Sequence, residues 1–403
     1  MRSRLWWVAG GIVVVAAAVA AVVLLAGSGS PSSRSPGHVA AAGHTPAIQA
    51  PAPTVPLSFT VAPANGAVNQ PLNTKVAVSA TPGRLTSVVV SAPGGTPVAG
   101  SLDPSGTSWQ STAALVPHAT YTVTAQALNQ AGQSIEQSSS FTTLTPTAVL
   151  QASIMPTEGL TVGVGMPIEL RFNHSVSDKA AVMAALHVTM STPVPGGWHW
   201  FSDKELHFRP EAYWPAGEQV TLTANLAGVD AGGGIWAETN SAVHFTVGDA
   251  HISTANVATH QMTVTTNGQV VATYPLSAGR TQYPTMNGVH IALYRQQNVL
   301  MDSSTVGIPR NGPGGYYEHV FWDVNISDGG EFVHAAPWSV GDQGRSNVSH
   351  GCINLSVANA IAFFNYSRVG DVVQVVGSPR PASLSDHGTM DWTTPWDQWA
   401  PAV

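Results

Sequence analysis

The sequence predicts a mainly β protein, built from two tandem immunoglobulin-like sandwiches and a third β-rich domain that ends in a tryptophan-rich segment. Gly (39) and Pro (29) are abundant among the 403 residues, which favours short strands and turns over long helices. Similar segments recur about one hundred residues apart, and their residues alternate with the period of half-buried strands. Only 9% of the residues are charged and the net charge is −7, which argues against a nucleic-acid-binding protein.

The chain begins with an uncharged apolar run at residues 5–27, which Arg2 and Arg4 precede. About 20 apolar residues cross a bilayer as a helix, and positive charge on the short N-terminal side favours a cytoplasmic N-terminus. We therefore expect residues 1–27 to anchor the protein in the cell membrane, with the remainder outside the cytoplasm. The alternative is a cleaved signal peptide and a secreted protein, because small residues around 26–30 suit a signal peptidase.

Residues 28–56 are rich in Pro, Ser, Gly and Ala and lack apolar periodicity, which predicts a flexible spacer. The two predicted sandwiches follow at residues 57–148 and 149–250. Their sequences match at a nearly constant offset: Gly66 corresponds to Gly159, "YTVTA" resembles "VTLTA", and the copies close with "SFTT" and "HFTV". Neither copy contains a credible catalytic cluster.

We expect the third domain at residues 251–378. It opens with "QMTVTTNGQVVATYPLS", in which Asn267-Gly268 between two alternating runs predicts a hairpin. Further on, "SVANAIAFFNYSRVG" predicts a short helix with Ser356 as its N-cap. Residues 379–403 carry three tryptophans among Pro and Asp, and we expect this C-terminal segment to pack on the third domain.

The sole cysteine of the chain, Cys352, lies in "SNVSHGCINLS". A free thiol near pKa 8.5 is mostly protonated at neutral pH, and because the thiolate is the nucleophile, a catalytic cysteine needs a base. His334 and His350 are the candidate bases. The residues between His334 and Cys352 include Pro, Gly and Ser, so they can form a loop that returns the histidine to the thiol.

The turn around the cysteine has the residues that an oxyanion site requires. Gly351 permits unusual backbone angles, and consecutive N–H groups that point one way stabilise a negative oxygen. Ser349 is placed to hydrogen-bond within this turn, and Asn354 to fix the loop or contact a substrate.

Two other interpretations of the same residues exist. A lone cysteine is often an inert buried residue, and histidines are often hydrogen-bonded in a core. A zinc site of His334, His350 and Cys352 is disfavoured, because neither a second cysteine nor a His-Glu-x-x-His motif supplies the missing ligand. Residue types and spacing alone leave the choice between catalysis and an inert thiol open.

The stretch "FVHAAPWSVGDQGRSNVSHGCINLS" closely resembles the signature of the L,D-transpeptidases, the YkuD-type enzymes that cross-link peptidoglycan. A histidine, a gap of about fifteen residues and Ser-His-Gly-Cys-x-Asn all match. The segments "VLMDSSTVGIP" and "MDWTTPWDQW" resemble the mycobacterial and actinobacterial members, in which an anchor and two immunoglobulin-like domains precede the catalytic domain. The resemblance therefore implies that residues 251–378 form a YkuD-type catalytic domain.

The resemblance also implies roles for single residues. Cys352 would be the nucleophile and His334 its base, and the backbone N–H groups of the Ser-His-Gly-Cys turn would form the oxyanion site. Met301 and Tyr316 would line the pocket for the donor stem, Tyr316 from a mobile loop over the site. Three further residues would shape this pocket and hold the loop: Trp338, His350 and Asn354. If these roles are wrong, Met301 and Trp338 fit core positions and Tyr316 fits a surface loop.

The chain departs from the family pattern at one position. Relatives commonly have Ser after the base histidine, whereas this chain has Ala335. If that residue orients the imidazole through its backbone carbonyl, alanine serves equally well, because every residue has that carbonyl. If the serine hydroxyl matters, activity should be reduced. We favour the carbonyl.

By resemblance, the expected reaction joins two peptidoglycan stem peptides. Cys352 would form a thioester with a tetrapeptide donor, and the diaminopimelate amine of a second stem would resolve it to a 3→3 cross-link. No metal or organic cofactor is expected, and carbapenem β-lactams should acylate the same thiol. The alternatives are an L,D-carboxypeptidase, in which water resolves the thioester, and a non-catalytic protein that binds or spans the cell wall.

Overall fold

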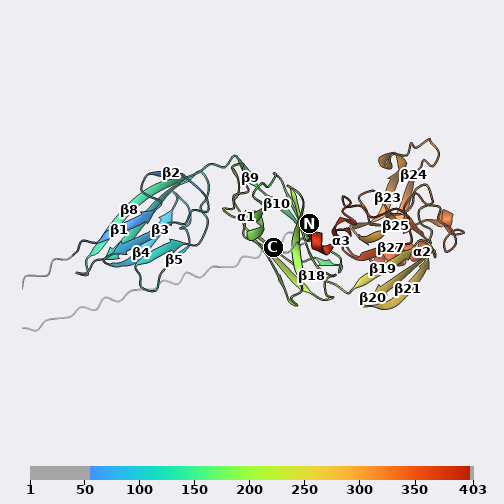
Figure 1. Ribbon diagram of the computed structural model, residues 1–403, viewed down its shortest axis with the longest axis horizontal. Coiled ribbons are helices and arrows are strands. Elements are labelled where there is room, and N and C mark those ends of the chain that lie inside the picture. The colour runs from blue at the N-terminus through green and yellow to red at the C-terminus, as the bar shows by residue number, and fades with distance from the viewer. Residues whose placement is uncertain (1–54, 400–403) are drawn as a thin grey trace, which may run out of the picture. The chain divides into compact units, whose positions relative to one another are not determined.

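The computed structural model describes residues 55–399 (Figure 1). The expected membrane anchor at residues 1–27 and nearly all of the expected spacer therefore lie outside the described residues. Within residues 55–399, no helix combines the length and the apolar character that a membrane-spanning segment needs.

The first domain is a sandwich of two four-stranded sheets whose inner faces share one core. Strand β7 (Thr120–Leu128) follows the expected alternation, because Tyr121, Val123 and Ala125 are buried while the threonines between them are not. One sheet has the order β1 (Ser58–Ala62), β3 (Ala77–Thr81), β6 (Ser108–Ser111), β5 (Gly100–Leu102). The other has the order β2 (Ala67–Gln70), β8 (Ser134–Thr143), β7 (Thr120–Leu128), β4 (Arg84–Ser91).

The second domain repeats this plan with two four-stranded sheets. One has the order β10 (Ala152–Met155), β12 (Ile168–Phe172), β15 (Glu205–Pro210), β14 (Gly196–Ser202). The other has the order β11 (Thr161–Val162), β18 (Ser241–Val247), β16 (Gln219–Ala224), β13 (Leu186–Met190). A short helix, α1 (Lys179–Ala184), and a two-stranded pair of β9 (Ala148–Leu150) with β17 (Ile235–Ala237) complete the domain.

The two sandwiches share one local geometry at their matching glycines. Gly66 and Gly159 have φ angles of 80° and 74°, which glycine adopts without a steric penalty. Their N–H groups donate to the carbonyls of Ser140 and His244 at 2.7 and 2.8 Å. Each bond ties the turn to the last long strand of its own domain, so the tandem repeat predicted from the sequence is confirmed.

The third domain packs a five-stranded sheet against a four-stranded sheet. Asn267 and Gly268 both have positive φ angles and join β20 (Gln261–Thr266) to β21 (Gln269–Pro275), as the hairpin prediction requires. The larger sheet has the order β21 (Gln269–Pro275), β20 (Gln261–Thr266), β19 (His251–Asn256), β27 (Val372–Val376), β22 (Gly288–Ile291). The smaller sheet has the order β23 (Tyr294–Asp302), β24 (Tyr317–Asn325), β25 (Phe332–Ala335), β26 (Ile353–Leu355).

Helix α2 (Val357–Tyr366) follows β26 directly, and its start confirms the predicted cap. The Ser356 hydroxyl accepts the backbone N–H of Asn359 at 3.3 Å. Ala360 and Phe363 are buried in the core that both sheets of the domain share. Short 3-10 turns at Ser303–Val306 and Pro337–Ser339 precede β24 and follow β25.

The C-terminal segment forms two short helices, α3 (Met390–Thr393) and α4 (Trp396–Trp399), and it corrects one expectation. The segment does touch the third domain, but its tryptophans pack on the second sandwich. The indole N–H groups of Trp392 and Trp399 donate to the carbonyls of Gly165 and Gly197, each at 2.8 Å. Apolar composition predicts that tryptophans are buried, but it does not identify the surface that buries them.

Arg209 of β15 holds this segment from the second sandwich. Its guanidinium donates to the carbonyls of Asp391 and Thr394, each at 2.9 Å, and only 3% of the residue is exposed. The tryptophan rings of the segment surround it at 4.5 to 5.3 Å from their centroids. A desolvated cation over aromatic faces is worth about 2 kcal/mol per good contact, so this arginine fixes the segment by charge as well as by shape.

Replacing Arg209 with methionine should lower the free energy of unfolding by about 3 kcal/mol, because two buried carbonyls lose their donor and the rings lose their cation. Urea unfolding followed by tryptophan fluorescence measures the change. Lys204→Met is the matched control, since Lys204 is exposed on the same sandwich and should change stability by less than about 0.5 kcal/mol. Equal stability of the two variants would show that Arg209 does not fix the segment.

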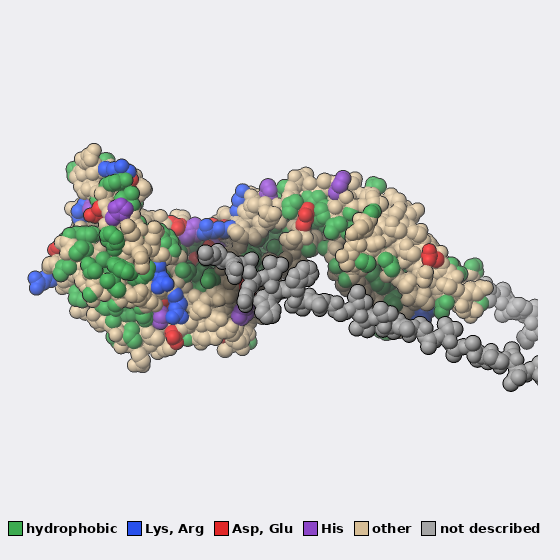
Figure 2. Space-filling model, turned by 180° about the vertical axis from the view of Figure 1, so that it is seen from behind, with side chains coloured by type: hydrophobic (Ala, Val, Ile, Leu, Met, Phe, Trp, Pro, Cys, Tyr) green, Lys and Arg blue, Asp and Glu red, His purple; other side chains and the backbone are tan. Residues whose placement is uncertain are grey.

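Several large apolar side chains are exposed on the third domain. Phe321, Trp338 and Val357 are 48%, 55% and 42% exposed. Figure 2 shows hydrophobic side chains gathered over the face of this domain that the view presents, with charged side chains few and scattered. The low content of charged residues in the sequence is therefore also apparent on this face of the domain.

Candidate active site

The parallel pairing of β25 with β26 brings the histidine and the cysteine together. His334 is in register with Asn354, and Cys352 lies two residues before Asn354. Because side chains alternate along a strand, Cys352 and Asn354 point to the same side as His334. All three side chains line one cavity of about 260 Å³, so the loop between His334 and Cys352 does return the chain as expected.

The tautomer of His334 follows from its hydrogen bond. Its Nδ1 lies 3.0 Å from the carbonyl oxygen of Ala335. A carbonyl only accepts, so Nδ1 carries the proton and Nε2 keeps its lone pair. Burial lowers the pKa of the imidazole to about 4, although the bond to Ala335 acts in the opposite direction. At neutral pH His334 is therefore an uncharged base with Nε2 available.

The geometry at Ala335 leads to an expected result for its substitution by serine. Ala335 is 4% exposed, and its side chain belongs to the core cluster, while its carbonyl holds His334. Ala335→Ser keeps that carbonyl, so the rate of acylation by a carbapenem should change by less than about threefold, under 1 kcal/mol. A tenfold gain in the acylation rate would show instead that a serine hydroxyl assists the base.

Cys352 is held as a neutral thiol. Its Sγ lies 3.7 Å from the carbonyl oxygen of Gly330. Burial raises the pKa of the thiol to about 12, the backbone N–H of Phe332 lowers it, and the carboxylates of Glu331 and Asp323 raise it further. A neutral thiol beside a neutral imidazole means that the proton must leave as the sulfur attacks, since no ion pair exists beforehand.

The turn before the cysteine is fixed by Ser349. Its hydroxyl donates to the carbonyl of Cys352 at 2.6 Å and accepts the N–H of Gly351 at 3.1 Å. Gly351 has a φ of 130°, a conformation that side chains rarely adopt, and a Cβ there would lie 3.1 Å from Glu331 Oε1. The N–H of Gly351 is thus used within the turn, whereas those of His350 and Cys352 donate to no protein acceptor within residues 55–399.

His350, the other candidate base, is engaged by a residue that the sequence analysis missed. Its Nε2 accepts a hydrogen bond from Arg280 Nη2 at 2.6 Å. Burial and the positive charge of Arg280 both lower the pKa of His350. Its ring lies 5.0 Å from that of Tyr316, between centroids. His350 therefore supports the wall of the site, and the lone pair that a base needs is already occupied.

The remaining predicted pocket residues lie around the same cavity. Met301 is half-buried at the end of β23, Tyr316 directly precedes β24, and Trp338 is 55% exposed on the 3-10 turn after β25. Trp338 is therefore not a core residue, and its ring lies 6.1 Å from that of His334. Asn354 is buried and donates from Nδ2 to the Ser339 hydroxyl at 3.1 Å, which fixes the turn that carries Trp338.

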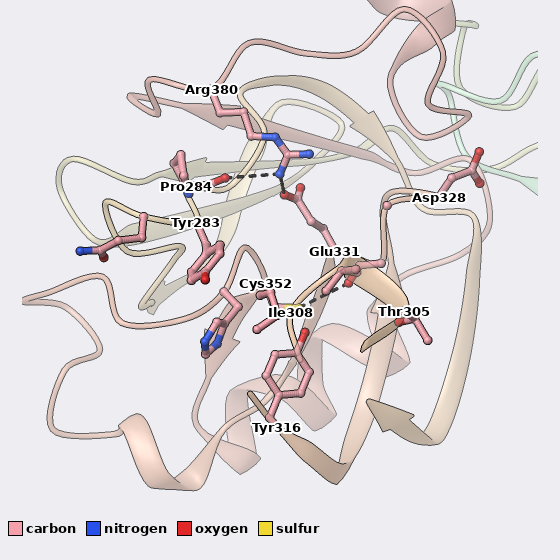
Figure 3. Close-up of a pocket in the computed structure, with 14 residues that line it drawn as sticks. Tyr283, Pro284, Thr305, Ile308, Tyr316, Asp328, Glu331, Cys352 and Arg380 are labelled. Atoms are coloured by element: carbon pink, nitrogen blue, oxygen red, sulfur yellow. Dashed lines mark hydrogen bonds and ion pairs between the residues drawn. The ribbon is translucent and has the colours of Figure 1, made fainter. Parts of the chain in front are cut away.

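A second and larger cavity, of about 580 Å³, adjoins the first at the cysteine (Figure 3). Tyr316, His350 and Cys352 line both cavities and form the wall between them. The larger cavity is also lined by Thr305, Val306 and Ile308 of the segment "VLMDSSTVGIP", and by residues that no motif indicated, including Tyr283, Glu331 and Arg380. The nucleophile candidate thus faces two separate spaces.

Buried charge near the cysteine was also missed from the sequence. Glu331 is 4% exposed, and burial raises the pKa of its carboxyl to about 7 despite its ion pair with Arg380. Asp323 is fully buried in β24, where burial likewise raises its pKa to about 7. The sequence did contain one indication of the role of Glu331. Only 9% of the residues are charged, yet this charged residue directly precedes the apolar stretch that contains His334. Within residues 55–399, no three His, Cys, Asp or Glu side chains gather as a metal site requires.

Comparison with known proteins gives the same assignment as the geometry. A family model for the L,D-transpeptidase catalytic domain, YkuD, matches residues 250–375, and one for a bacterial Ig domain matches residues 67–230. L,D-transpeptidase 2 of Mycobacterium tuberculosis is 40% identical over 341 residues, which cover 85% of this chain and 83% of the relative. L,D-transpeptidase 5 of the same species is 33% identical over 370 residues, which cover 90% and 80%.

A solved structure is similar in both sequence and fold. The L,D-transpeptidase LdtMt1, in complex with imipenem, is 36% identical with a TM-score of 0.50, and the match covers 57% of this chain and 100% of that chain. The similarity to the curated relatives extends over most of this chain, well beyond the cysteine motif. The chain therefore belongs to the L,D-transpeptidase family of enzymes.

Proposed function

We propose that the protein forms 3→3 cross-links between peptidoglycan stem peptides through a thioester on Cys352. The donor is a tetrapeptide stem, cleaved after its third residue, and the acceptor is the side-chain amine of diaminopimelate in a second stem. The observation that carries this proposal is the pair of cavities that meet at Cys352. A transpeptidase needs room for two peptides at one sulfur, whereas a hydrolase needs room for one peptide and water.

We assign the donor to the smaller cavity and the acceptor to the larger. The smaller cavity contains His334 together with Met301 and Tyr316, the residues that the family resemblance places on the donor stem. Its lining is mostly apolar, which suits a peptide held in extended form. The larger cavity approaches the same sulfur from the other side of Tyr316 and His350.

Acylation of the enzyme follows from the protonation states. Nε2 of His334 takes the thiol proton as Sγ of Cys352 attacks the carbonyl carbon of the third residue. The N–H groups of His350 and Cys352 stabilise the oxyanion. When the C–N bond breaks, protonated His334 gives the proton to the departing amine of D-Ala. His334 is then neutral again, and the acyl group is on sulfur.

In the second half of the reaction, the acceptor amine displaces the sulfur, and the proton transfers run in the opposite direction. The uncharged amine attacks the thioester carbon, and His334 takes a proton from the attacking nitrogen. The C–S bond breaks, and the sulfur of Cys352 recovers the proton from His334. A new amide bond has formed, so the enzyme returns to its starting state without any external acid or base.

Carbapenems should enter by the first of these steps. The Cys352 sulfur would attack the strained lactam carbonyl and open the ring, which leaves a thioester that no amine displaces efficiently. The complex of the related LdtMt1 with imipenem supports this proposal. We also propose that the reaction occurs outside the cytoplasm at the cell membrane, on the basis of the N-terminal apolar run alone.

Incubation of the purified chain with a disaccharide-tetrapeptide, followed by mass spectrometry, tests the proposal. A dimer with the 3→3 linkage and released D-Ala is the expected product. Release of D-Ala with only the tripeptide would identify an L,D-carboxypeptidase. Absence of both products and of imipenem acylation would indicate a protein without catalytic activity.

A further inference from the structure

A glycine-rich loop at the larger cavity, residues 303–316, is a compact unit that we call the lid. Its two ends are joined, because the N–H of Ser303 donates to the carbonyl of Tyr316 at 3.1 Å and the N–H of Tyr316 donates to the Ser303 hydroxyl at 3.0 Å. Several lid residues line the larger cavity, as Cys352 does: Thr305, Val306, Ile308 and Tyr316. The position of the lid therefore affects access to the sulfur.

Arg280 connects the turn of the cysteine to this lid. Its backbone N–H donates to the carbonyl of Ser349 at 3.0 Å, and its Nη2 donates to His350 Nε2 at 2.6 Å. Its guanidinium also lies 5.0 Å from the ring centroid of Tyr283. Both the backbone and the side chain of Arg280 are therefore fixed, although the reaction chemistry above does not use this residue.

The lid packs on this arginine at Gly314. The φ of Gly314 is 82°, and a Cβ there would lie 2.7 Å from Arg280 Nη2 and 3.2 Å from His350 Nε2. These are the two atoms that share the hydrogen bond. No side chain fits between them and the lid, so the backbone of the lid lies directly against the bond between Arg280 and His350.

His350 extends the hold of Arg280 to the end of the lid. Its ring lies 5.2 Å from that of Tyr283 and 5.0 Å from that of Tyr316, between centroids. Figure 3 shows these two tyrosines on different sides of Cys352. Because Nε2 accepts from Arg280, the imidazole has one fixed orientation and presents a constant face to Tyr316, the last residue of the lid.

We propose that Arg280 is a positioning residue that, together with His350, holds the lid closed over Cys352. A ligand enters when the lid moves away from Arg280, and it is retained when the contact forms again. This role is separate from the bond changes at Cys352 and His334, so it concerns every compound that acylates the sulfur. It does not depend on the 3→3 cross-linking proposed above.

Alkylation of Cys352 measures access to the site, because the chain has no other cysteine. The test compares the rate with a bulky reagent, N-pyrenylmaleimide, and the rate with a small one, iodoacetamide. The ratio of the two rates cancels the thiolate fraction, on which both reactions depend. In Arg280→Gln this ratio should rise about tenfold, because a hydrogen bond from a charged donor is lost. Arg280→Lys keeps a charged donor and should restore part of the native ratio.

Two glycines of the lid provide a matched pair of variants. Gly314→Ala must displace Arg280, so it should raise the ratio as Arg280→Gln does, and the double variant should add little more. Gly307 has a similar φ of 78°, but a Cβ there would meet nothing within 4 Å. Gly307→Ala therefore introduces the same backbone strain without the contact, and it should change the ratio by less than about twofold.

The contact should also affect acylation by imipenem. In Arg280→Gln, the imipenem concentration that gives half of the maximal rate should rise about tenfold, because the lid no longer retains the ligand. The maximal rate should change by less than about threefold, because Cys352 and His334 are unaltered.

Three results would overturn the inference. They are an unchanged alkylation ratio in Arg280→Gln, equal effects of Gly314→Ala and Gly307→Ala, and a loss confined to the maximal acylation rate, which would assign Arg280 to the chemical step. None of them concerns the linkage of the cross-linked product, so the proposed function is decided separately by its own experiment.

Discussion

Replacing Cys352 with alanine is expected to abolish acyl-enzyme formation and to reduce cross-linking by at least about 10⁴-fold. Every bond change of the proposed reaction passes through this sulfur, and Cys352 is the sole cysteine of the chain. The fold should persist, because Cys352 lines two cavities and its Sγ contact with the Gly330 carbonyl is long, at 3.7 Å. Intact-protein mass spectrometry after exposure to imipenem and to the tetrapeptide donor measures both effects.

The serine variant is the matched control for Cys352→Ala. Cys352→Ser preserves the shape of the side chain but replaces the thiol with a hydroxyl that is far less acidic, so acylation should be slower by orders of magnitude. The thermal unfolding temperature of both variants should stay close to that of the native chain. A mass increase of the alanine variant by one imipenem would show that another residue is the nucleophile.

Replacing His334 with alanine is expected to lower the acylation rate at neutral pH by about 10² to 10⁴-fold and to change its pH dependence. In the native chain the imidazole has a pKa of about 4. Its base form is lost as the pH falls through that value, and the rate should fall with it. Above that pH the rate should be level, because the proton passes from a neutral thiol to a neutral base.

Without His334, reaction requires free thiolate. Burial raises the pKa of Cys352 to about 12, so the thiolate fraction of the variant should increase about tenfold for each pH unit toward that value. The measurement is the imipenem acylation rate between pH 4 and pH 10 for both proteins. A level profile in His334→Ala would assign the base elsewhere, and His350→Gln then tests the other histidine.

The sequence predicted the parts of the site that are local in the chain. The turn at Ser349 to Cys352 and the cap at Ser356 depend on residues within four positions, and their residue types indicate their hydrogen bonds. The proximity of His334 to Cys352 could be predicted because the family motif contains both residues at a defined spacing. The structure adds that a parallel strand pair produces it, through the register of His334 with Asn354.

The parts that the sequence did not predict depend on contacts between distant segments. Arg280 is 70 residues from His350, and Arg380 is 49 residues from Glu331. Neither arginine lies in a motif, and a charged residue outside a motif is expected to be exposed to solvent. Asp323 reads as an ordinary strand residue, yet the register shift in β24 beside it accompanies a fully buried carboxyl.

The tandem sandwiches were predictable for a different reason. Their alternating strands and matching glycines repeat, so each copy supports the interpretation of the other. The destination of the tryptophans was not predictable, because Trp392 and Trp399 bond to backbone carbonyls more than 200 residues away in the second sandwich. Burial of these tryptophans could be inferred because their side chains are large and apolar. The surface that buries them depends on contacts between segments distant in the sequence.

The neutral state of Cys352 has a consequence for the lifetime of the enzyme. Hydrogen peroxide attacks thiolates, and oxidation to sulfenic and sulfinic acids follows the thiolate fraction of a cysteine. A thiol with a pKa of about 12 offers almost no thiolate at neutral pH. In the proposed mechanism, the proton leaves the sulfur only when a substrate carbonyl is in place to be attacked. We therefore expect the burial that keeps this thiol protonated to slow its oxidation by peroxide before a substrate binds.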